Sequence, residues 1–304
     1  MIELTRADNF IKEFERVYSL KVHKIPLEYF DGRRVLLLMC KCSGVWIDLP
    51  YHSQGYAQTD LSDFDNKAPF KFVESQDGNL FCTKNIKWQL RDTRAYSNHI
   101  YADKLNFSLD LNNNQLIGNA NVRRKIRKAK ASNLKVVSGG KELVKDFYKV
   151  YSQRMYELGS PACGKSLIRR LVKHKSNKIF VVYHNQLPIG GATLSLRNIN
   201  SAENVLFATD IRYNHFYTSY LLHDAMIEYA RNNNLSTYFL GRSTRNSSVH
   251  LYKKHFRPTE VDLYWSNSHA TKNIRDNKLF RKLWRLLPFR LATLLGPFAN
   301  RFVY

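Results

Sequence analysis

Residues 179–197 read IFVVYHNQLPIGGATLSLR, and this stretch decides the fold. Two apolar runs, 179–184 and 189–197, flank the turn sequence from Asn185 to Pro188. Short apolar runs bounded by turn residues predict β-strands. A third strand is predicted over 204–209. Three successive strands in the second half of the chain place a sheet at the centre of this part of the protein.

The periodicity on both sides of this stretch predicts helices that cover the sheet. Upstream we expect a strand over 134–138, a helix over 143–158 ended by Gly159 and Pro161, and a second helix over 165–174. Downstream we expect a helix over 218–232, a strand over 238–240, a helix over 247–255 and a strand over 261–265. The predicted order is therefore β-α-α-β-β-β-α-β-α-β.

The first part of the chain is less regular. We predict a helix over 5–18 that begins with a Thr5–Asp8 capping box, and a hairpin formed by 35–40 and 45–49 around Ser43-Gly44. Residues 51–99 show little periodicity, 104–110 alternate like a strand, and 113–132 predict a helix. We expect three parts: an N-terminal subdomain (1–133), a C-terminal subdomain (134–268) and a basic tail (269–304).

Net charge is the unusual feature of the composition. The 304 residues include 48 Lys and Arg against 25 Asp and Glu, a formal charge of +23, whereas the hydrophobic fraction of 44% is ordinary for a globular protein. Such a charge predicts attraction to polyanions such as nucleic acid, anionic lipid or phosphate-bearing substrates. Four cysteines exclude a disulfide scaffold, and we expect no metal and no cofactor. With no secretion signal and no membrane span in the sequence, we expect a cytoplasmic protein.

One candidate site follows the strand expected over 238–240. An arginine at a strand end can grip a carboxylate or phosphate with its planar fork, which makes Arg242 and Ser243 candidate substrate-binding residues. In the next helix, Lys253 is a candidate catalytic residue that would stabilise negative charge on a carbonyl or phosphate. The alternatives are a turn glycine beside a surface arginine, and a solvated lysine pair formed with Lys254.

Two further sets of residues are weaker candidates. Asp210 is a candidate base, with helix capping as the alternative, and Tyr217 is a candidate substrate contact. The loop 210–219 has no glycine, which argues against a donor bound through the pyrophosphate of coenzyme A. In the basic run 121–130 (NVRRKIRKAK), Arg124 and Arg127 are candidate phosphate contacts, with an ordinary solvated helix as the alternative.

The tail separates apolar from basic residues on a helical wheel. Leu279, Leu283 and Trp284 lie on one side, and Lys278, Arg281, Lys282 and Arg285 lie on the other. This pattern is typical of helices that lie in a membrane interface, so residues 274–298 are expected to contact an anionic membrane surface. The alternative is a helix docked on the core.

Several ordered motifs resemble the FemAB-like branch of the GNAT acyltransferase superfamily, particularly members associated with exopolysaccharide and exosortase genes. They are Leu49-Pro50-Tyr51 with Gly55, the strand 88–91, the basic run 123–129, the MYELGSP run 155–161, Gly241-Arg242-Ser243, Tyr252-Lys253 and Leu263-Tyr264. The predicted element order also matches the GNAT core. Three departures stand out: Leu240 replaces the family's aspartate, 255–258 replace an aromatic-glycine pair, and the first subdomain is short.

The resemblance implies an α/β mixed-sheet fold with tandem GNAT-like subdomains, the first abbreviated, followed by the amphipathic helical tail. It also implies transfer of an acyl or aminoacyl group onto an amine of a cell-envelope or polysaccharide precursor. Aminoacyl-tRNA is the implied donor class, and a lipid- or nucleotide-linked glycan is the implied acceptor. The alternative is a catalytically inactive protein that holds RNA or anionic lipid on the same basic surface. We expect the protein at the inner face of the cytoplasmic membrane.

Overall fold

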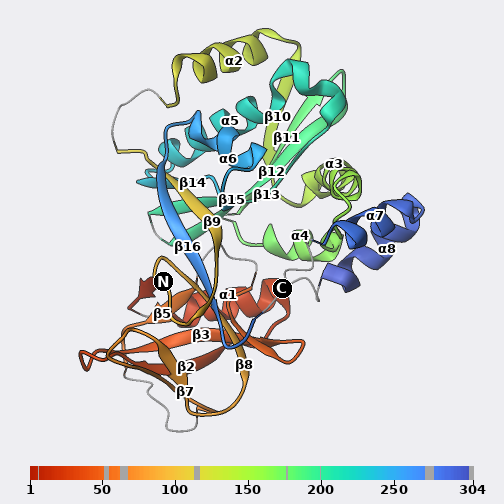
Figure 1. Ribbon diagram of the computed structural model, residues 1–304. Coiled ribbons are helices and arrows are strands. Elements are labelled where there is room, and N and C mark those ends of the chain that lie inside the picture. Colours follow the sequence, from red (N-terminus) through yellow and green to blue (C-terminus); the bar gives the residue numbers. More distant parts are fainter. Residues whose placement is uncertain are drawn as a thin grey trace. The chain divides into compact units, whose positions relative to one another are not determined.

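The computed structural model describes residues 1–5, 7–50, 55–61, 68–112, 117–175, 177–198, 200–270 and 277–300. Tyr51 of the LPY motif and residues 113–116 of the helix expected over 113–132 lie outside these residues, as do 271–276 of the tail. The chain forms two compact units (Figure 1). Unit 1 comprises Met1–Leu105 with Val261–Asn273, and unit 2 comprises Asn106–Glu260 with Ile274–Val303. Unit 2 therefore contains the helix of the basic run and the tail as well as most of the second predicted subdomain. The division into three parts, 1–133, 134–268 and 269–304, stays a prediction.

A mixed sheet forms the centre of unit 2. Its strands are β10 (Leu134–Gly139), β11 (Lys178–His184), β12 (Leu187–Asn198), β13 (Ser201–Thr209), β14 (Thr237–Phe239) and the end of β9 (His99–Asp110), in that spatial order. Neighbouring strands are antiparallel except β13 and β14, which pair in parallel from Ser201↔Thr237 to Glu203↔Phe239. The strands predicted in this half of the chain are confirmed, with ends shifted by one to three residues.

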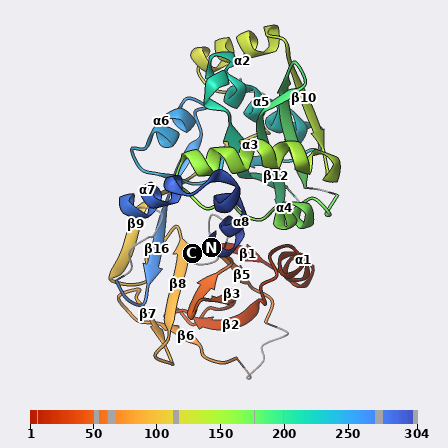
Figure 2. The same ribbon diagram turned by 90° about the vertical axis from the view of Figure 1, so that its right-hand side faces the viewer.

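Helices cover both faces of this sheet. A methyl group at Gly191 would lie 2.6 Å from Phe147 Cδ2 of α3 (Val144–Glu157), whereas one at Gly190 would lie 2.5 Å from Thr218 Cγ2 of α5 (Thr218–Asn232). Successive strand residues point to opposite faces, so α3 and α5 lie on opposite sides of β12 (Figure 2). The glycine pair permits both helices to approach closely.

Within Asn106–Glu260 of unit 2, α4 (Lys165–Leu171) and α6 (Ser248–Lys254) agree with the predicted order. The same part contains α2 (Ala120–Ala131) and the short helices η1 (Lys141–Leu143) and η2 (Ile211–Phe216). Asn119 caps α2, because its Oδ1 accepts a hydrogen bond of 3.0 Å from Val122 N, so this helix begins later than residue 113. The helix expected over 165–174 ends at Leu171.

The tail forms α7 (Lys278–Leu286) and α8 (Phe289–Ala299) and docks on unit 2. Trp284 is buried, and Arg281 Nε donates to Leu158 O at 3.0 Å. Gly159, with φ +67°, has no room for a side chain because the backbone of Arg281 lies against it. The glycine of the MYELGSP run thus ends α3 and admits α7.

Unit 1 is built on a sheet with the strand order β8-β4-β3-β2-β6-β7, and β16 runs along β8. The strands are β2 (His23–Glu28), β3 (Arg34–Cys42), β4 (Val45–Asp48), β6 (Phe72–Glu74), β7 (Leu80–Cys82), β8 (Lys87–Asp92) and β16 (Thr259–Asn267). In the same unit β5 (Tyr56–Gln58) pairs with β3, and β1 (Ile2–Leu4) pairs with β5, whereas β15 (Ser243–Thr244) belongs to unit 2 and pairs with β9. The predicted hairpin of β3 and β4 is confirmed. Among the described residues of unit 1, α1 (Asp8–Tyr18) is the sole α-helix. The predicted Thr5–Asp8 capping box is wrong: the helix begins at Asp8 and Ala7 is the N-cap, and an alanine side chain has no oxygen that could accept a hydrogen bond.

A buried ion pair holds the centre of unit 1. Arg91, 1% exposed, donates from Nε to Asp48 Oδ1 at 2.9 Å and from Nη2 to Leu49 O at 2.7 Å. Its backbone N donates to Asp48 Oδ2 at 2.7 Å, and its carbonyl accepts from Gly55 N at 2.8 Å. Three motif positions far apart in the sequence, Leu49, Gly55 and Arg91, are therefore joined in one network. This part of the family pattern stabilises the fold.

Replacing Arg91 by Met should lower the free energy of unfolding by about 3–5 kcal/mol, because it leaves the Asp48 carboxylate buried without its partner. Urea unfolding at pH 7 measures the loss. Arg34→Met is the matched control, since Arg34 pairs with Glu28 at 3.1 Å on the surface and should change stability by less than about 1 kcal/mol. Equal losses of unfolding free energy in the two variants would show that the buried pair contributes no more to stability than the surface pair.

Candidate functional site

Lys253 lies in α6 and is 6% exposed. Its Nζ donates to Gly241 O at 2.7 Å and to Arg242 O at 2.9 Å, two residues of the segment between β14 and β15. The ammonium also lies 5.2 Å from the centre of the Phe107 ring. A lysine ammonium has three N–H donors, and within the described chain two of them bond to these carbonyls. Burial, reinforced by the positive charge of Arg242, lowers the pKa of Lys253 to about 7.

The loop that Lys253 holds is shaped by Gly241, whose φ is +75°. A side chain at this position would be strained, and its methyl group would lie 2.9 Å from Asn204 O. Ser243 follows in the loop and is buried, and its Oγ has no hydrogen-bond partner among the described residues. The Asn204 side chain on β13 is buried too, and its Oδ1 is likewise unpartnered within the described chain. Buried unpaired oxygens of this kind are available to a bound polar group.

An aromatic wall surrounds the lysine. His223 of α5 is buried, and its Nδ1 lies 2.8 Å from Tyr238 Oη. Burial, with Lys253 as a second cause, lowers the pKa of His223 to about 3, so the imidazole is neutral at pH 7. Phe256 stacks against Tyr220 at 5.8 Å and meets the His223 ring at 5.2 Å. The apolar surroundings explain why the ammonium of Lys253 is desolvated.

Tyr217 lies at the start of α5, where it adopts φ +56° and serves as the N-cap residue. Lys125 of the basic helix donates to Tyr220 Oη at 3.0 Å, and its Nζ lies 5.8 Å from the centre of the Tyr217 ring. Tyr217 is therefore next to α2. The sequence placed Lys125 in a basic run without any means to distinguish it from its neighbours.

Some cations of the basic run on α2 bond to neighbouring residues, and others face solvent. Lys130 pairs with Asp224 at 2.6 Å, and Arg123 Nη1 donates to Gly118 O at 2.6 Å. Arg124 and Arg127 are exposed, and Arg124 bonds to Asn121 Oδ1 of its own helix at 3.0 Å. The two candidate phosphate contacts are thus on the open side of the helix.

Asp210 lies elsewhere in unit 2, in a cavity of about 450 Å³ at the ends of α3 and β13. Its carboxylate accepts hydrogen bonds from Arg212, including one of 3.0 Å from the backbone N, and so caps η2. The hydrogen bonds from Arg212 lower the pKa of Asp210, which weakens it as a base. The cavity wall contains none of Lys253, Arg242 and Ser243. The structure therefore brings Arg242, Ser243 and Lys253 together and gives Asp210 the geometry of a cap.

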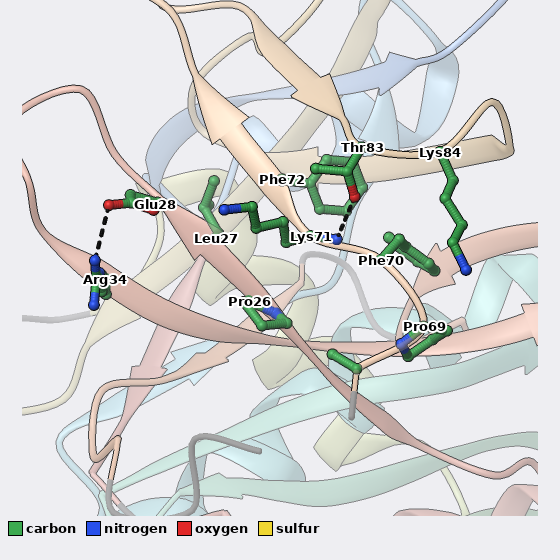
Figure 3. A pocket seen from close by; sticks show the side chains of 11 residues that line it. Pro26, Leu27, Glu28, Arg34, Pro69, Phe70, Lys71, Phe72, Thr83 and Lys84 are labelled. Atoms are coloured by element: carbon green, nitrogen blue, oxygen red, sulfur yellow. Dashed lines mark hydrogen bonds and ion pairs between the residues drawn. The ribbon is translucent and has the colours of Figure 1, made fainter. Parts of the chain in front are cut away.

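A second cavity, of about 540 Å³, lies in unit 1 (Figure 3). Phe70 and Phe72 in its wall are buried, the Glu28 and Arg34 side chains pair at 3.1 Å, and Lys71 N donates to Thr83 Oγ1 at 3.0 Å. None of the site residues predicted from the sequence lines it.

The described part of the chain contains neither a metal-binding cluster of side chains nor a membrane-spanning helix. No three His, Cys, Asp or Glu side chains gather there in a metal-binding arrangement. The cysteines carry free thiols, and burial raises the pKa of the Cys40 thiol. None of the described helices has the length and apolarity that crossing a bilayer demands.

Comparisons with known proteins agree with this architecture. Residues 169–263 match the FemAB family model. The crystal structure of FemX superposes with a TM-score of 0.59 at 12% identity, over 85% of this chain and 90% of FemX. The C-terminal domain of a putative lysylphosphatidylglycerol synthetase from Agrobacterium fabrum gives 0.54 at 11% identity, over 85% and 87%. L-PGS from Bacillus licheniformis gives 0.54 at 9% identity, over 91% of each chain. No curated protein sequence matches the chain.

The element order of unit 2 and these structural likenesses define a protein with the GNAT fold. Within that fold the chain is FemAB-like, as the family match over the second subdomain and the likeness to FemX indicate. The resemblance expected from the sequence motifs is therefore confirmed at this level. Assignment to the exopolysaccharide-associated branch stays a prediction.

The low pKa of Lys253 predicts a pH-dependent stability. Between about pH 7 and the ordinary lysine value of 10.5, the unfolded chain holds a proton on Lys253 that the folded chain has lost. Folding stability gained from this group therefore rises with pH across that window, by up to about 1.4 kcal/mol per pH unit. Urea unfolding of wild type and Lys253→Met at a series of pH values gives the difference between their free energies of unfolding. The contributions of the other titratable groups cancel in this difference. A difference that stays constant from pH 7 to 10 would contradict the buried ammonium.

Proposed function

We propose that the protein is an acyltransferase that moves an acyl or aminoacyl group onto an amine of a cell-envelope or polysaccharide precursor. One observation carries the proposal: a buried lysine, Lys253, stands at the end of β14 beside Arg242 and Ser243 in a FemAB-like GNAT fold. The aminoacyl-transfer part is supported by FemX and the two synthetase structures, whose likeness to this chain is one of fold.

The arrangement suits acyl transfer in the following way. The acceptor amine attacks the donor carbonyl, the C–N bond forms, and the carbonyl oxygen gains negative charge. In this proposal the third N–H of the Lys253 ammonium stabilises that oxygen, an effect that is strong in a site shielded from water. The bond to the leaving oxygen then breaks, and the amine proton passes to the leaving group. Arg242 supplies a planar cation for a carboxylate or phosphate, and Ser243 Oγ supplies an unused hydrogen-bonding group.

Aminoacyl-tRNA is the donor class that fits best. The formal charge of +23 favours a polyanion, and α2 exposes Arg124 and Arg127 as phosphate contacts. Tyr217, at the start of α5, is proposed as a further substrate contact, because Lys125 of the same helix α2 lies against its ring. The loop that precedes α5 contains no glycine to admit a pyrophosphate, which disfavours coenzyme A. Asp210 has no role in this proposal.

The acceptor in this proposal is a lipid- or nucleotide-linked glycan that carries a free amine. Its synthesis would place the protein at the inner face of the cytoplasmic membrane, with residues 274–298 against anionic lipid. The exopolysaccharide-associated motifs, above all MYELGSP and Gly241-Arg242-Ser243, support the glycan class.

A non-catalytic protein that binds RNA or anionic lipid is the second candidate, and two observations favour it. Leu240 is a buried apolar residue where the family motif has aspartate, and Lys253 already donates to two backbone carbonyls. A lysine used only to hold the loop would need no further donor.

Mass spectrometry of the envelope glycan, with and without this protein, distinguishes the two candidates. We expect an N-linked acyl or aminoacyl adduct only in cells that contain the protein. Arg242→Lys should reduce this adduct at least tenfold, because lysine lacks the planar fork. Lys254→Ala is the control and should leave the adduct near wild-type level, since Lys254 is exposed and pairs with Glu260 at 3.7 Å on the surface. No adduct in wild-type cells would favour the non-catalytic candidate.

The RNA surface has its own test. Arg124→Gln with Arg127→Gln should weaken binding to unfractionated tRNA and reduce the slope of log affinity against log salt by roughly 1.5–2. Filter binding between 50 and 300 mM salt measures both quantities. Lys21→Gln with Lys41→Gln removes two exposed cations from unit 1 and should leave the slope unchanged. If both pairs of substitutions have the same effect, α2 is not the RNA surface.

A further inference from the structure

The docked tail leaves an apolar surface open to solvent. On α7, Leu279, Leu283 and Leu286 recur at helical spacing, and Leu286 is 73% exposed. On α8 the apolar residues exposed on one side of the helix are Leu291, Leu294, Leu295 and Phe298. We call these seven residues the tail apolar face. Exposed apolar surface of this extent on a soluble unit marks an interaction site.

This surface differs from the one that the helical wheel predicts. Trp284 was expected among the membrane-facing residues, yet it is buried against unit 2. Arg281, expected on the basic side, is half-buried and bonds to Leu158 O. A helical wheel takes no account of packing on unit 2, which buries one face of α7 and leaves another face exposed. The prediction also underestimated α8, which supplies four of the seven residues.

Docking fixes the orientation of this face. Tyr156 Oη bonds to Arg285 O and to Leu287 O, both at 2.9 Å, and its ring meets that of Phe289 at 5.4 Å. A methyl group at Gly296 would lie 2.8 Å from Ala162 O, so the opposite side of α8 packs closely on the loop after α3. The two helices therefore present the tail apolar face as one preformed surface.

The charge beside this face selects its partner. Residues 277–300 contain five Lys and Arg and no Asp or Glu. Lys278, Lys282, Arg285 and Arg290 are exposed, and Arg281 and Leu286 complete a shallow hollow with the first three. Apolar side chains bordered by cations complement acyl chains below anionic lipid head groups. A protein partner would need to be both acidic at its rim and strongly apolar.

We propose that α7 and α8 insert together, as a docked pair, into one leaflet of an anionic bilayer through the tail apolar face. This deepens the membrane part of the proposed function and rests on it. No helix has to leave unit 2 for insertion.

Vesicle co-sedimentation of the full chain tests the proposal. We expect binding to vesicles of three parts phosphatidylcholine and one part phosphatidylglycerol, and at least tenfold weaker binding to phosphatidylcholine alone. Phe298→Glu should weaken binding to the mixed vesicles at least tenfold. Phe81→Glu is the matched control in unit 1, because Phe81 is 63% exposed and Phe298 is 62% exposed. Thermal unfolding should be the same for both variants.

Cation replacement tests the electrostatic part. Lys278→Gln with Lys282→Gln should weaken binding to the mixed vesicles about thirtyfold. Lys173→Gln with Lys175→Gln, two exposed lysines of unit 2 outside the tail, should change it less than threefold.

Two results would overturn the proposal. One is that the Phe298→Glu variant binds the mixed vesicles as strongly as the wild-type protein does. The other is a wild-type dimer in sedimentation equilibrium that Leu294→Glu converts to a monomer while vesicle binding persists, which would assign the face to a second copy. These measurements need no donor or acceptor. Failure of insertion is therefore distinct from absence of the glycan adduct, which would contradict the proposed function instead.

Discussion

The contact between Lys253 Nζ and the carbonyls of Gly241 and Arg242 is the interaction on which the candidate site depends. It ties α6 to the end of β14 and fixes the loop that carries Ser243. The surrounding ring wall, with neutral His223 and Phe256, desolvates the ammonium and lowers its pKa. A charge buried in this way opposes folding unless it is hydrogen-bonded, so its two carbonyl partners are structural requirements as well as features of the site.

The second half of the fold was predictable because its elements are long and strongly periodic. The helix over 218–232 was predicted with the bounds that α5 has, and the strands around Asn185–Pro188 were placed to within a few residues. Much of unit 1 was not predictable. Strands β1, β5, β6 and β7 have three residues each, too few to show a period. Pairing with distant parts of the chain holds β1, β5 and β6, and β7 pairs with β6.

The candidate site was predictable in part, for a different reason. Arg242, Ser243 and Lys253 could be singled out because they are polar residues at a strand end and on the next helix. The buried network of Asp48 and Arg91 could not, since only the fold brings positions 43 residues apart into contact. Nor could the sequence tell that Asp210 caps η2, that Lys125 reaches Tyr220, or that Trp284 packs inward. Each of these depends on which side of a helix or turn the tertiary contacts occupy.

The central claim is that the ammonium of Lys253 acts on the donor carbonyl as well as holding the loop. The most direct test is the glycan adduct, measured by mass spectrometry in cells whose own copy is replaced by Lys253→Met, with Lys254→Met as the matched control at equal protein level. Loss of an oxyanion contact should reduce the adduct by about 10²–10³ in the first variant and leave it near wild-type level in the second. An unchanged adduct with Lys253→Met would contradict the account, because the lysine would then be a structural residue alone.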